Sequence, residues 1–342
     1  MITITRRELL MSLPALGAVS ARLVDSRVGA QAGTTPLRVR SINHFGIAVS
    51  DPKRSIDFYQ GLFGMPVQSR DGATTMLRVG AGPQFLAIAP AAPGMPPRIT
   101  HFGLGLGGFD VDRVLMALTQ HGLTRSTTIG PMKVTVTTRN GSDVVAFGDL
   151  EGTVCQLQDV TYCGGSGPLG NRCAIEPSPA KGLMPLTGLN HLTISSGDAV
   201  RTNQFYRDRF GFSIRSYQGP TAPTLAVGPT TQFLMFTGGG AGRSGAAAAP
   251  RPASINHACF TLDRFNPDEI LETLEKVGIT PRGSASGAAG PLRHYVTMRM
   301  QNRGGAPGGT PELYFTDPDG LLMQLQDSGY CGGSGYLGNE CP

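Results

Sequence analysis

Four of the six histidines in this 342-residue sequence occupy equivalent places in a repeated pattern. His44 and His191 follow asparagine in the segments NHFGIAV and NHLTIS, and His101 and His257 lie in the segments ITHFGLGL and INHACF. These short apolar runs are typical of strands. Neutral imidazole is a common ligand of Zn, Fe and Ni. We therefore treat the four histidines as candidate metal ligands; the alternative is that they are hydrogen-bonded core residues that bind no metal.

A long repeat sets the arrangement of these residues. Residues 317–341 (DPDGLLMQLQDSGYCGGSGYLGNEC) match residues 149–173 (DLEGTVCQLQDVTYCGGSGPLGNRC), and equivalent positions lie 168 residues apart. A repeat on this scale indicates two copies of one domain, which agrees with the usual domain size of about 100–200 residues. Each of the four histidines then opens one of four related units.

Two cysteine pairs with the same spacing bracket glycine-rich loops: Cys163 with Cys173, and Cys331 with Cys341. We predict that each pair forms a local disulfide, worth about 3 kcal/mol because it restricts the unfolded chain, and that the protein matures in an oxidising compartment. A metal site on each pair is the alternative, but neither loop contains a histidine to complete it. Cys155 and Cys259 have no counterpart in the other copy, and we interpret them as buried free thiols.

Helix and strand signals divide the sequence after residue 40 into four strand–helix–three-strand units. In the first unit, Asp51 and Pro52 are typical of a helix start and Gly64 of a helix end. Similar signals predict helices over residues 110–121, 198–210 and 267–277. The units pair into two domains: residues 40–174, with units 41–92 and 98–160, and residues 186–342, with units 186–238 and 253–328. A proline-rich linker, residues 175–185, separates them.

Two internal alignments relate the units across the copies: NHFGIAVSDPKRSIDFYQGLFGM with NHLTISSGDAVRTNQFYRDRFGF, and GPMKVTVTTR with GPLRHYVTMR. With this architecture the chain resembles the vicinal oxygen chelate superfamily, which includes glyoxalase I, extradiol ring-cleaving dioxygenases, epimerases and bleomycin resistance proteins. The resemblance implies an α+β fold of four βαβββ units paired into two tandem domains. Each domain would be a curled mixed sheet that forms a cup, with helices outside.

The resemblance also implies where the ligands meet. In the family, first-strand residues of two paired units converge in one cup with a last-strand residue, four positions after the glycine of a DPDG-type turn. The implied sets are His44, His101 and Gln156 in the first cup and His191, His257 and Gln324 in the second cup. The expected cofactors are thus one or two divalent ions of Zn, Fe, Mn, Ni or Co.

Glutamine replaces the family's usual glutamate in both sets. A neutral amide oxygen binds a divalent cation more weakly than a carboxylate does and leaves more charge on the ion, which favours Lewis-acid chemistry on a carbonyl or enolate oxygen. The replacement also argues against a ferrous centre of two histidines and one carboxylate. Gln84 and Gln232, on the last strand of the first unit in each copy, could approach as fourth ligands.

The second copy carries two further candidates. His294 and Tyr314 match, by order and approximate spacing, a histidine and a tyrosine that lie between the second and third ligands of extradiol dioxygenases and assist substrate deprotonation. The resemblance therefore implies catalytic roles for both, with His294 as a general base because its pKa lies near working pH. The alternative for His294 is a surface position at a strand edge.

The charge distribution and the N-terminal segment limit the expected binding partners and the cellular location of the protein. The formal net charge is +5, but six arginines fall within the first 40 residues, so no basic stripe for nucleic acid remains. Arg6 and Arg7 precede a short apolar run, and we interpret residues 1–32 as a twin-arginine-type signal peptide, with a disordered basic tail as the alternative. The run is too short for a permanent membrane anchor. We expect an exported, periplasmic or secreted protein with a small-molecule substrate and, if it associates, a homodimer.

These observations predict an exported metal-dependent enzyme whose second cup chelates a small oxygen-rich substrate through two adjacent oxygens. The expected chemistry is of the isomerase, epimerase or lyase type, by Lewis-acid and general-base action. Two alternatives stay open: a ferrous extradiol-type ring-cleaving dioxygenase, and a non-catalytic small-molecule binding protein of the resistance type.

Overall fold

The computed structural model describes residues 37–238 and 252–342, and the predicted signal segment 1–32 lies outside them. The first copy contains, in chain order, β1 (Val39–Val49), α1 (Pro52–Phe63), β2 (Val67–Asp71), β3 (Thr74–Arg78), β4 (Phe85–Pro90), β5 (Arg98–Leu106), α2 (Val111–Gln120), β6 (Thr124–Arg125), β7 (Lys133–Arg139), β8 (Ser142–Gly148) and β9 (Val154–Asp159).

The second copy repeats this order. It contains β10 (Leu186–Ser195), α3 (Ala199–Phe210), β11 (Ile214–Tyr217), β12 (Pro223–Ala226), β13 (Phe233–Thr237), β14 (Ser254–Leu262), α4 (Pro267–Lys276), β15 (Thr280–Pro281), β16 (Arg293–Arg299), the 3-10 helix η1 (Gln301–Arg303), β17 (Thr310–Thr316) and β18 (Leu322–Asp327). The two-residue edge strands β6 and β15 are additions that the sequence did not predict.

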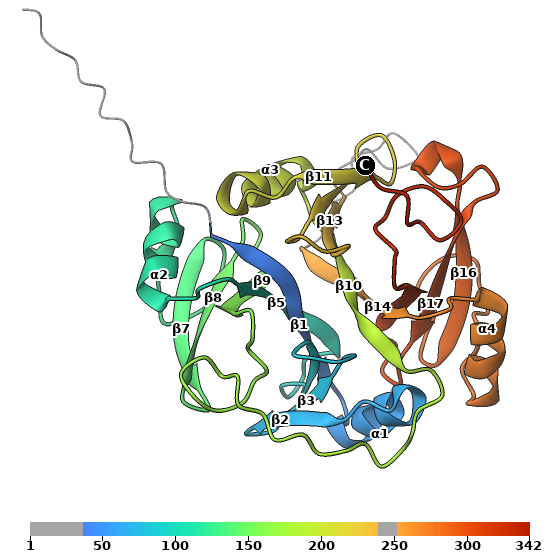
Figure 1. The fold of residues 1–342 in the computed structure, drawn as a ribbon, viewed down its shortest axis with the longest axis horizontal. Helices are drawn as coiled ribbons and strands as arrows, with labels where there is room; N and C mark the ends of the chain where they lie inside the picture. Colours follow the sequence, from blue (N-terminus) through green and yellow to red (C-terminus); the bar gives the residue numbers. More distant parts are fainter. Residues whose placement is uncertain (1–36, 239–251) are drawn as a thin grey trace, which may run out of the picture. The chain divides into compact units, whose positions relative to one another are not determined.

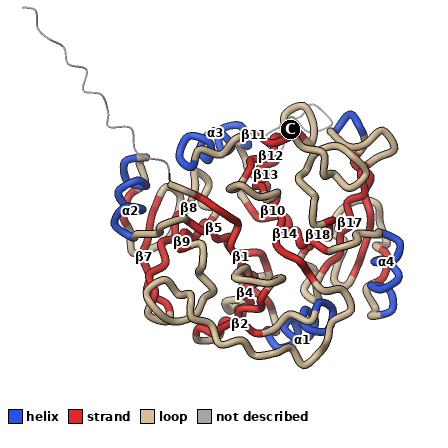
Figure 2. Tube along the Cα trace, in the orientation of Figure 1, coloured by secondary structure: helices blue, strands red, loops and turns tan. Residues whose placement is uncertain are grey.

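The strands form two nine-stranded mixed sheets, one from each copy (Figures 1 and 2). Their orders are β2-β3-β4-β1-β5-β9-β8-β7-β6 and β11-β12-β13-β10-β14-β18-β17-β16-β15. In each sheet the opening strands of the two units are antiparallel neighbours at the centre, β1 with β5 and β10 with β14. The predicted fold class, two tandem domains of paired βαβββ units, is confirmed. The opening-strand histidines consequently lie in the middle of each sheet.

The helices begin and end where the sequence indicates. The Asp51 carboxylate accepts a hydrogen bond from the Arg54 backbone N–H at the start of α1, and Gly64 ends that helix with a φ of 68°. Asp198 and Gly211 play the same parts for α3. A side-chain acceptor satisfies one of the free N–H groups of the first turn, and glycine adopts the left-handed backbone of the last turn without steric strain.

The repeated turn that precedes the last strand of each copy contacts a helix of the other copy. Tyr59 of α1 donates its hydroxyl to Asp317 Oδ2 at 3.3 Å, and Tyr206 of α3 donates to Asp149 Oδ2 at 3.3 Å. Both carboxyls are buried. The repeated DPDG and DLEG segments therefore join the two sheets as well as turning the chain.

Gln84 and Gln232 also bridge the two sheets, through backbone groups of β1 and β10. Gln84 donates Nε2 to Ile42 O at 2.9 Å, and its Oε1 accepts from Leu189 N at 2.9 Å. Gln232 accepts from Ile42 N at 2.8 Å and donates to Leu189 O at 2.8 Å. Both ends of each amide thus link the two sheets, and these contacts give no support to the suggestion that the two glutamines are fourth metal ligands.

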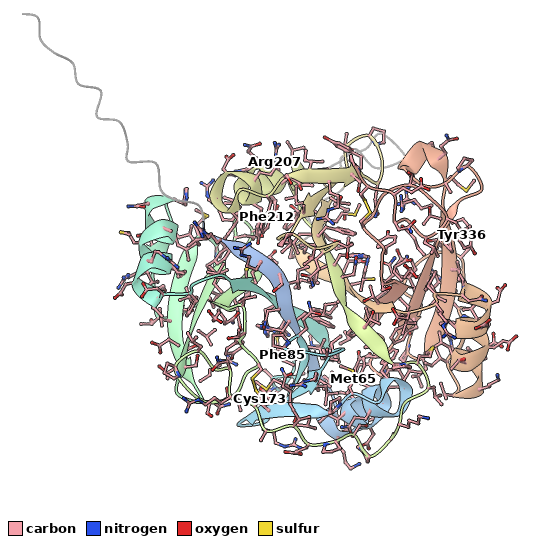
Figure 3. The ribbon with its side chains drawn as sticks, viewed as in Figure 1. Met65, Phe85, Cys173, Arg207, Phe212 and Tyr336 are labelled. Atoms are coloured by element: carbon pink, nitrogen blue, oxygen red, sulfur yellow. A yellow bond between two sulfur atoms is a disulfide. The ribbon has the colours of Figure 1, made fainter. Side chains whose placement is uncertain are left out.

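Both predicted disulfides form, Cys163–Cys173 and Cys331–Cys341, and Cys173 is labelled in Figure 3. Cys155 and Cys259 are buried free thiols, as expected. Each disulfide loop follows the last strand of its sheet and starts directly after a buried tyrosine, Tyr162 or Tyr330. The two disulfides are consistent with an oxidising compartment. Within the two described ranges, no helix combines the length and apolar character needed to cross a membrane.

Candidate functional site

The first cup brings together the three residues expected there, from the neighbouring strands β1, β5 and β9. The ring centroids of His44 and His101 lie 5.4 Å apart, and His44 Nε2 lies 3.2 Å from Gln156 Oε1. Two glycines make room for the rings. A Cβ on Gly46 would lie 2.1 Å from His101 Cε1, and a Cβ on Gly103 would lie 2.1 Å from His44 Cε1. With the rings placed as they are in this cup, a Cβ at either position would overlap a histidine ring.

The His44 ring faces an oxygen at both of its nitrogens. Nδ1 lies 2.9 Å from Asn43 Oδ1, and the Asn43 amide is oriented because its Nδ2 donates to Tyr162 O at 2.9 Å. Nε2 faces Gln156 Oε1, which also accepts from Gln158 Nε2 at 3.0 Å. Burial, then the neighbouring His101, hold the pKa of His44 well below its usual value. The neutral ring carries a single N–H, which can donate to only one of these two amide oxygens. The other ring nitrogen therefore directs its lone pair at the lone pairs of the oxygen that it faces.

The second cup repeats this arrangement with β10, β14 and β18. His191 Nδ1 lies 2.8 Å from Asn190 Oδ1, and His191 Nε2 lies 3.0 Å from Gln324 Oε1. His257 Nδ1 lies 2.8 Å from Asn256 Oδ1. Within the described part of the chain, the buried Nε2 of His257 has no hydrogen-bond partner. Burial lowers the pKa of His257 to about 4, so this nitrogen presents a free lone pair at neutral pH.

These contacts fit a divalent cation in each cup. A metal-bound histidine commonly donates its other ring N–H to a carbonyl oxygen, which leaves the remaining lone pair for the ion. The side chains of Asn43, Asn190 and Asn256 offer that carbonyl, and Thr100 Oγ1 lies 2.7 Å from His101 Nδ1. A cation at the Nε2 atoms would also relieve the lone-pair contacts with the glutamine oxygens. Among residues 37–238 and 252–342, no cluster of three or more His, Cys, Asp or Glu could hold a metal ion.

A cavity of about 240 Å³ opens onto the first cup. Its apolar wall includes Met76, Phe85 and Ala87, and Phe85, labelled in Figure 3, stacks on the His44 ring with centroids 4.4 Å apart. The polar lining residues are His44, Thr74, Thr100, His101, Arg139, Gln156 and Tyr162. Among the described residues that line the cavity, none is an aspartate or a glutamate. The cavity therefore combines the candidate metal ligands with one cationic side chain.

Larger side chains fill the corresponding space in the second cup. The strand registers make four first-cup residues equivalent to bulkier second-cup residues: Gly46 to Thr193, Gly103 to Cys259, Ala87 to Met235, and Ala146 to Tyr314. Thr193, Cys259 and Met235 are all buried. The difference in side-chain volume explains why the cavity adjoins the first set of ligands.

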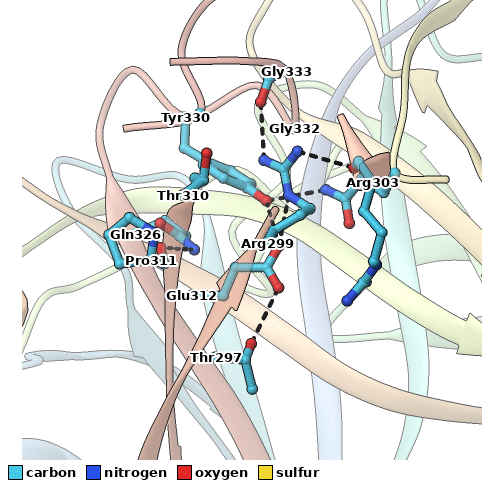
Figure 4. A network of polar contacts seen from close by, with 12 residues as sticks. Thr297, Arg299, Arg303, Thr310, Pro311, Glu312, Gln326, Tyr330, Gly332 and Gly333 are labelled. Atoms are coloured by element: carbon cyan, nitrogen blue, oxygen red, sulfur yellow. Dashed lines mark hydrogen bonds and ion pairs between the residues drawn. The ribbon is translucent and has the colours of Figure 1, made fainter. Parts of the chain in front are cut away.

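A buried ion pair also occupies the second cup (Figure 4). Arg299 on β16 donates Nε to Glu312 Oε1 on β17 at 2.9 Å, and the two side chains are 0% and 4% exposed. Tyr330 donates its hydroxyl to Glu312 Oε1 at 3.4 Å, and Arg299 Nη2 donates to Gly333 O at 2.9 Å. Burial of both charges requires this pairing. The network joins β16, β17 and the second disulfide loop.

Sequence reasoning missed two residues of the first-cup cavity, Arg139 and Tyr162. The charge of Arg139 adds to burial in lowering the pKa of His101 to about 4. Burial raises the pKa of Tyr162 to about 12, so its phenol keeps its proton. Both had a signal in the repeat, because GPMKVTVTTR aligns Arg139 with Arg299 and the cysteine pattern aligns Tyr162 with Tyr330.

The structure separates the two catalytic candidates of the second copy. Tyr314 pairs with Gln324 across the strands, and its ring makes an edge contact with His257 at 5.4 Å between centroids. His294 pairs instead with Phe315, and its Nε2 lies 3.2 Å from Glu275 Oε1 of α4. Adjacent residues of a strand face opposite sides. This corrects the expectation that His294 faces the second cup: it lies on the helix-covered side of the sheet.

Comparisons with known proteins agree with this fold. The Glyoxalase/Bleomycin resistance protein/Dioxygenase superfamily matches residues 41–144 and 188–325. Among solved structures, the Mn(II)-bound glyoxalase from Novosphingobium aromaticivorans is 16% identical, covers 84% of this chain and 82% of that chain, and has a TM-score of 0.58. A catechol 2,3-dioxygenase is 15% identical, with coverages of 87% and 88% and a TM-score of 0.56. A variant of homoprotocatechuate 2,3-dioxygenase from B. fuscum is 16% identical, with coverages of 86% and 74% and a TM-score of 0.59. A comparison with curated proteins finds no match.

Proposed function

The chain belongs to the Glyoxalase/Bleomycin resistance protein/Dioxygenase superfamily, and we propose that it is a divalent-metal-dependent enzyme whose reaction site is the first cup. The observation that carries the proposal is the cavity of about 240 Å³ beside His44, His101 and Gln156. A catalytic metal site needs space for a substrate next to the protein ligands. The sequence favoured the second cup as the substrate site. That cup has the same donor types, but larger side chains take up the space beside them, so we propose the first cup as the reaction site instead and assign the second a structural role.

The first-cup residues would hold the ion through two neutral imidazoles and one amide oxygen. Burial keeps the pKa of both His44 and His101 low, so neither ring must lose a proton before binding. Asn43 Oδ1 would accept the hydrogen on His44 Nδ1, and Thr100 Oγ1 would accept the hydrogen on His101 Nδ1. These two hydrogen bonds fix the orientation of the rings. Gln156 adds no negative charge. When bound, the ion would polarise a carbonyl or stabilise an enolate oxygen of the substrate.

The remaining lining residues would bind and orient the substrate. Tyr162 keeps its proton at working pH because burial raises its pKa to about 12, so it can donate a hydrogen bond to a substrate oxygen. The apolar wall of Met76, Phe85 and Ala87 limits water around the substrate. These features support isomerase, epimerase or lyase chemistry on a small oxygen-bearing substrate. His294, the general base expected for both the isomerase-type reaction and the ferrous dioxygenase alternative, lies on the opposite side of its sheet and serves neither. What argues against the dioxygenase is the neutral Gln156 at the place where a ferrous centre usually has a carboxylate.

Export of the protein remains part of the proposal. Residues 1–32 carry the twin-arginine-type pattern with Arg6 and Arg7, and the two disulfides support an oxidising destination. Replacement of both arginines by lysine should hold the protein inside a bacterial host that has the twin-arginine route. Unchanged export of this variant would contradict that route.

Elemental analysis of the full chain, purified from its exported compartment, tests the metal centres. Wild type should carry between one and two divalent ions per chain. His101→Ala should remove the first-cup ion and abolish activity, whereas His257→Ala should remove a second-cup ion and leave the first. His121→Ala is the matched control, since this histidine ends α2 outside both cups. A wild-type protein without metal, or an unchanged content in His101→Ala, would show that the histidines are hydrogen-bonded core residues.

Turnover distinguishes the reaction classes. Hydrogen–deuterium exchange next to the carbonyl of small 2-oxo compounds, followed by NMR, reports enolate formation and should require the loaded wild-type protein. Oxygen uptake with catechol after addition of ferrous iron would replace the proposal with the dioxygenase alternative. Stoichiometric ligand binding without any turnover would favour a binding protein.

A further inference from the structure

The two cups share an arginine but differ in its partner. Arg139 pairs across β7 and β8 with Ser142, and Arg299 pairs across β16 and β17 with Thr310, so the two arginines occupy the same place in their sheets. In the same registers Ala146 lies opposite Gln156 and Tyr314 opposite Gln324. Val144 of the first sheet is therefore equivalent to Glu312 of the second. The second cup contains a carboxylate where the first contains an apolar side chain.

In the second cup, the contacts of the Glu312 carboxylate show which side chains of the site bind a carboxylate. Besides Arg299 Nε at 2.9 Å, Glu312 accepts from the hydroxyls of Tyr330 at 3.4 Å and Thr297 at 3.3 Å (Figure 4). It also accepts from the Tyr314 hydroxyl at 3.5 Å. One arginine and three hydroxyls thus surround two oxygens that are almost fully buried. Charge-assisted bonds from arginine to a carboxylate are among the stronger polar contacts in proteins.

In the first cup, the arginine and tyrosine are present and the carboxylate is not. Arg139 and Tyr162, the equivalents of Arg299 and Tyr330, both line the cavity. The nearest acid to Arg139 is Asp71, whose Oδ2 lies 3.8 Å from Nη1, beyond hydrogen-bond distance, and the two side chains are 38% and 28% exposed. Solvent-exposed ion pairs of this kind are weak, so Asp71 competes weakly with a ligand for Arg139.

We propose that the first cup binds a small carboxylate, whose carboxylate group takes the place that the Glu312 side chain has in the second cup and pairs with Arg139 and Tyr162. This inference deepens the proposed function, since it names the substrate class of the same cavity. The cavity of about 240 Å³ is below the usual range of roughly 300–1,000 Å³ for drug-sized ligands, which limits the substrate to a small molecule. Its far end would reach the histidines, and Met76, Phe85 and Ala87 would contact its apolar part.

Calorimetric titration with benzoate and with benzamide tests the inference, because the two probes have similar shape and differ in charge. The full wild-type chain, as purified, should bind benzoate at least about tenfold more tightly than benzamide, because only benzoate can form a charge-assisted pair with Arg139. Arg139→Gln should abolish this preference, and Tyr162→Phe should reduce it several-fold. Val144→Glu should block benzoate by supplying an internal carboxylate, as Glu312 does.

Arg125→Gln is the matched control, since Arg125 is an exposed arginine of the same domain on β6 and does not line the cavity. It should keep the preference for benzoate. The inference is overturned if wild type binds neither probe, binds both equally, or retains its preference in Arg139→Gln. If Arg125→Gln and Arg139→Gln show the same preference for benzoate over benzamide, the preference depends on the overall charge of the protein. That result would also overturn the inference.

Repetition of the titration after chelator treatment separates this inference from the metal proposal. A charge preference that depends on Arg139 and survives chelation supports the carboxylate site, even where elemental analysis finds no bound metal. Metal content that is normal in Arg139→Gln, together with a missing charge preference in wild type, would refute the carboxylate site and leave the metal proposal standing.

Discussion

Replacement of Glu312 by Leu should destabilise the protein by about 3–5 kcal/mol, the usual cost of breaking a buried ion pair. The Arg299 side chain is 0% exposed and Glu312 is 4% exposed, with 2.9 Å between Nε and Oε1. The variant leaves a buried guanidinium without a counter-charge. By contrast, Arg139→Gln in the first cup should cost at most about 1 kcal/mol, because its pair is loose and solvated.

The double variant Arg299→Met with Glu312→Leu completes the test. Replacing both partners of a buried pair by apolar side chains is often neutral or stabilising, so the double variant should recover most of the loss caused by Glu312→Leu alone. Urea unfolding followed by far-UV circular dichroism, with the disulfides intact, gives the free energy of unfolding of each protein. A cost below about 1 kcal/mol for Glu312→Leu, or a double variant no more stable than the single one, would refute the assignment of this pair as a structural counterpart of the first-cup ligand.

Three further predictions follow from particular contacts. Burial raises the pKa of Asp317 from 3.8 to about 6, so the folded state binds the proton of this carboxyl more tightly than the unfolded state does. The tighter proton binding stabilises the folded state by about 3 kcal/mol. This stabilisation is complete below about pH 4 and is lost as the pH rises through about 6. Asp317→Asn should flatten the unfolding free energy between pH 4 and 7, and an unchanged slope would contradict this reasoning. Replacing Cys163 and Cys173 by serine should lower the unfolding free energy by about 3 kcal/mol and leave the metal content unaltered; loss of metal in the folded variant would show that the loop organises the ligands. Ala87→Met should fill the first-cup cavity as Met235 fills the second, so benzoate binding should fall while bound metal stays, and undiminished binding would place the ligand elsewhere.

Much of the architecture was predictable because its signals are local. Asp51 and Gly64 bound α1 through a side-chain cap and a left-handed glycine, and these depend on adjacent residues alone. The repeat of residues 149–173 at 317–341 requires the same local structure twice. Equal spacing in Cys163–Cys173 and Cys331–Cys341 made both disulfides predictable, since each closes a short loop. The grouping of His44 with His101 and Gln156 was reached through resemblance to a family, and the structure brings these residues together.

The side of the sheet that each residue faces was decided by strand register. His294 was expected near Gln324, but it pairs with Phe315 on the helix-covered side, and a shift of one residue reverses the side on which a strand residue lies. Chain order and approximate spacing cannot set that register, because it depends on how β16 pairs with β17. Tyr314, the other candidate of the second copy, pairs directly with Gln324.

The sequence by itself determined the duplicated fold and its matched histidines, because periodicity, caps and repeats act over short stretches of chain. The tertiary structure decided which cup contains a cavity and which arginine lacks a buried counter-charge. Those properties depend on side chains brought together from several strands, such as Gly46 against Thr193 and Val144 against Glu312. The volume and the net charge of a site depend on all the side chains that surround it, and these come together only when the sheet has formed.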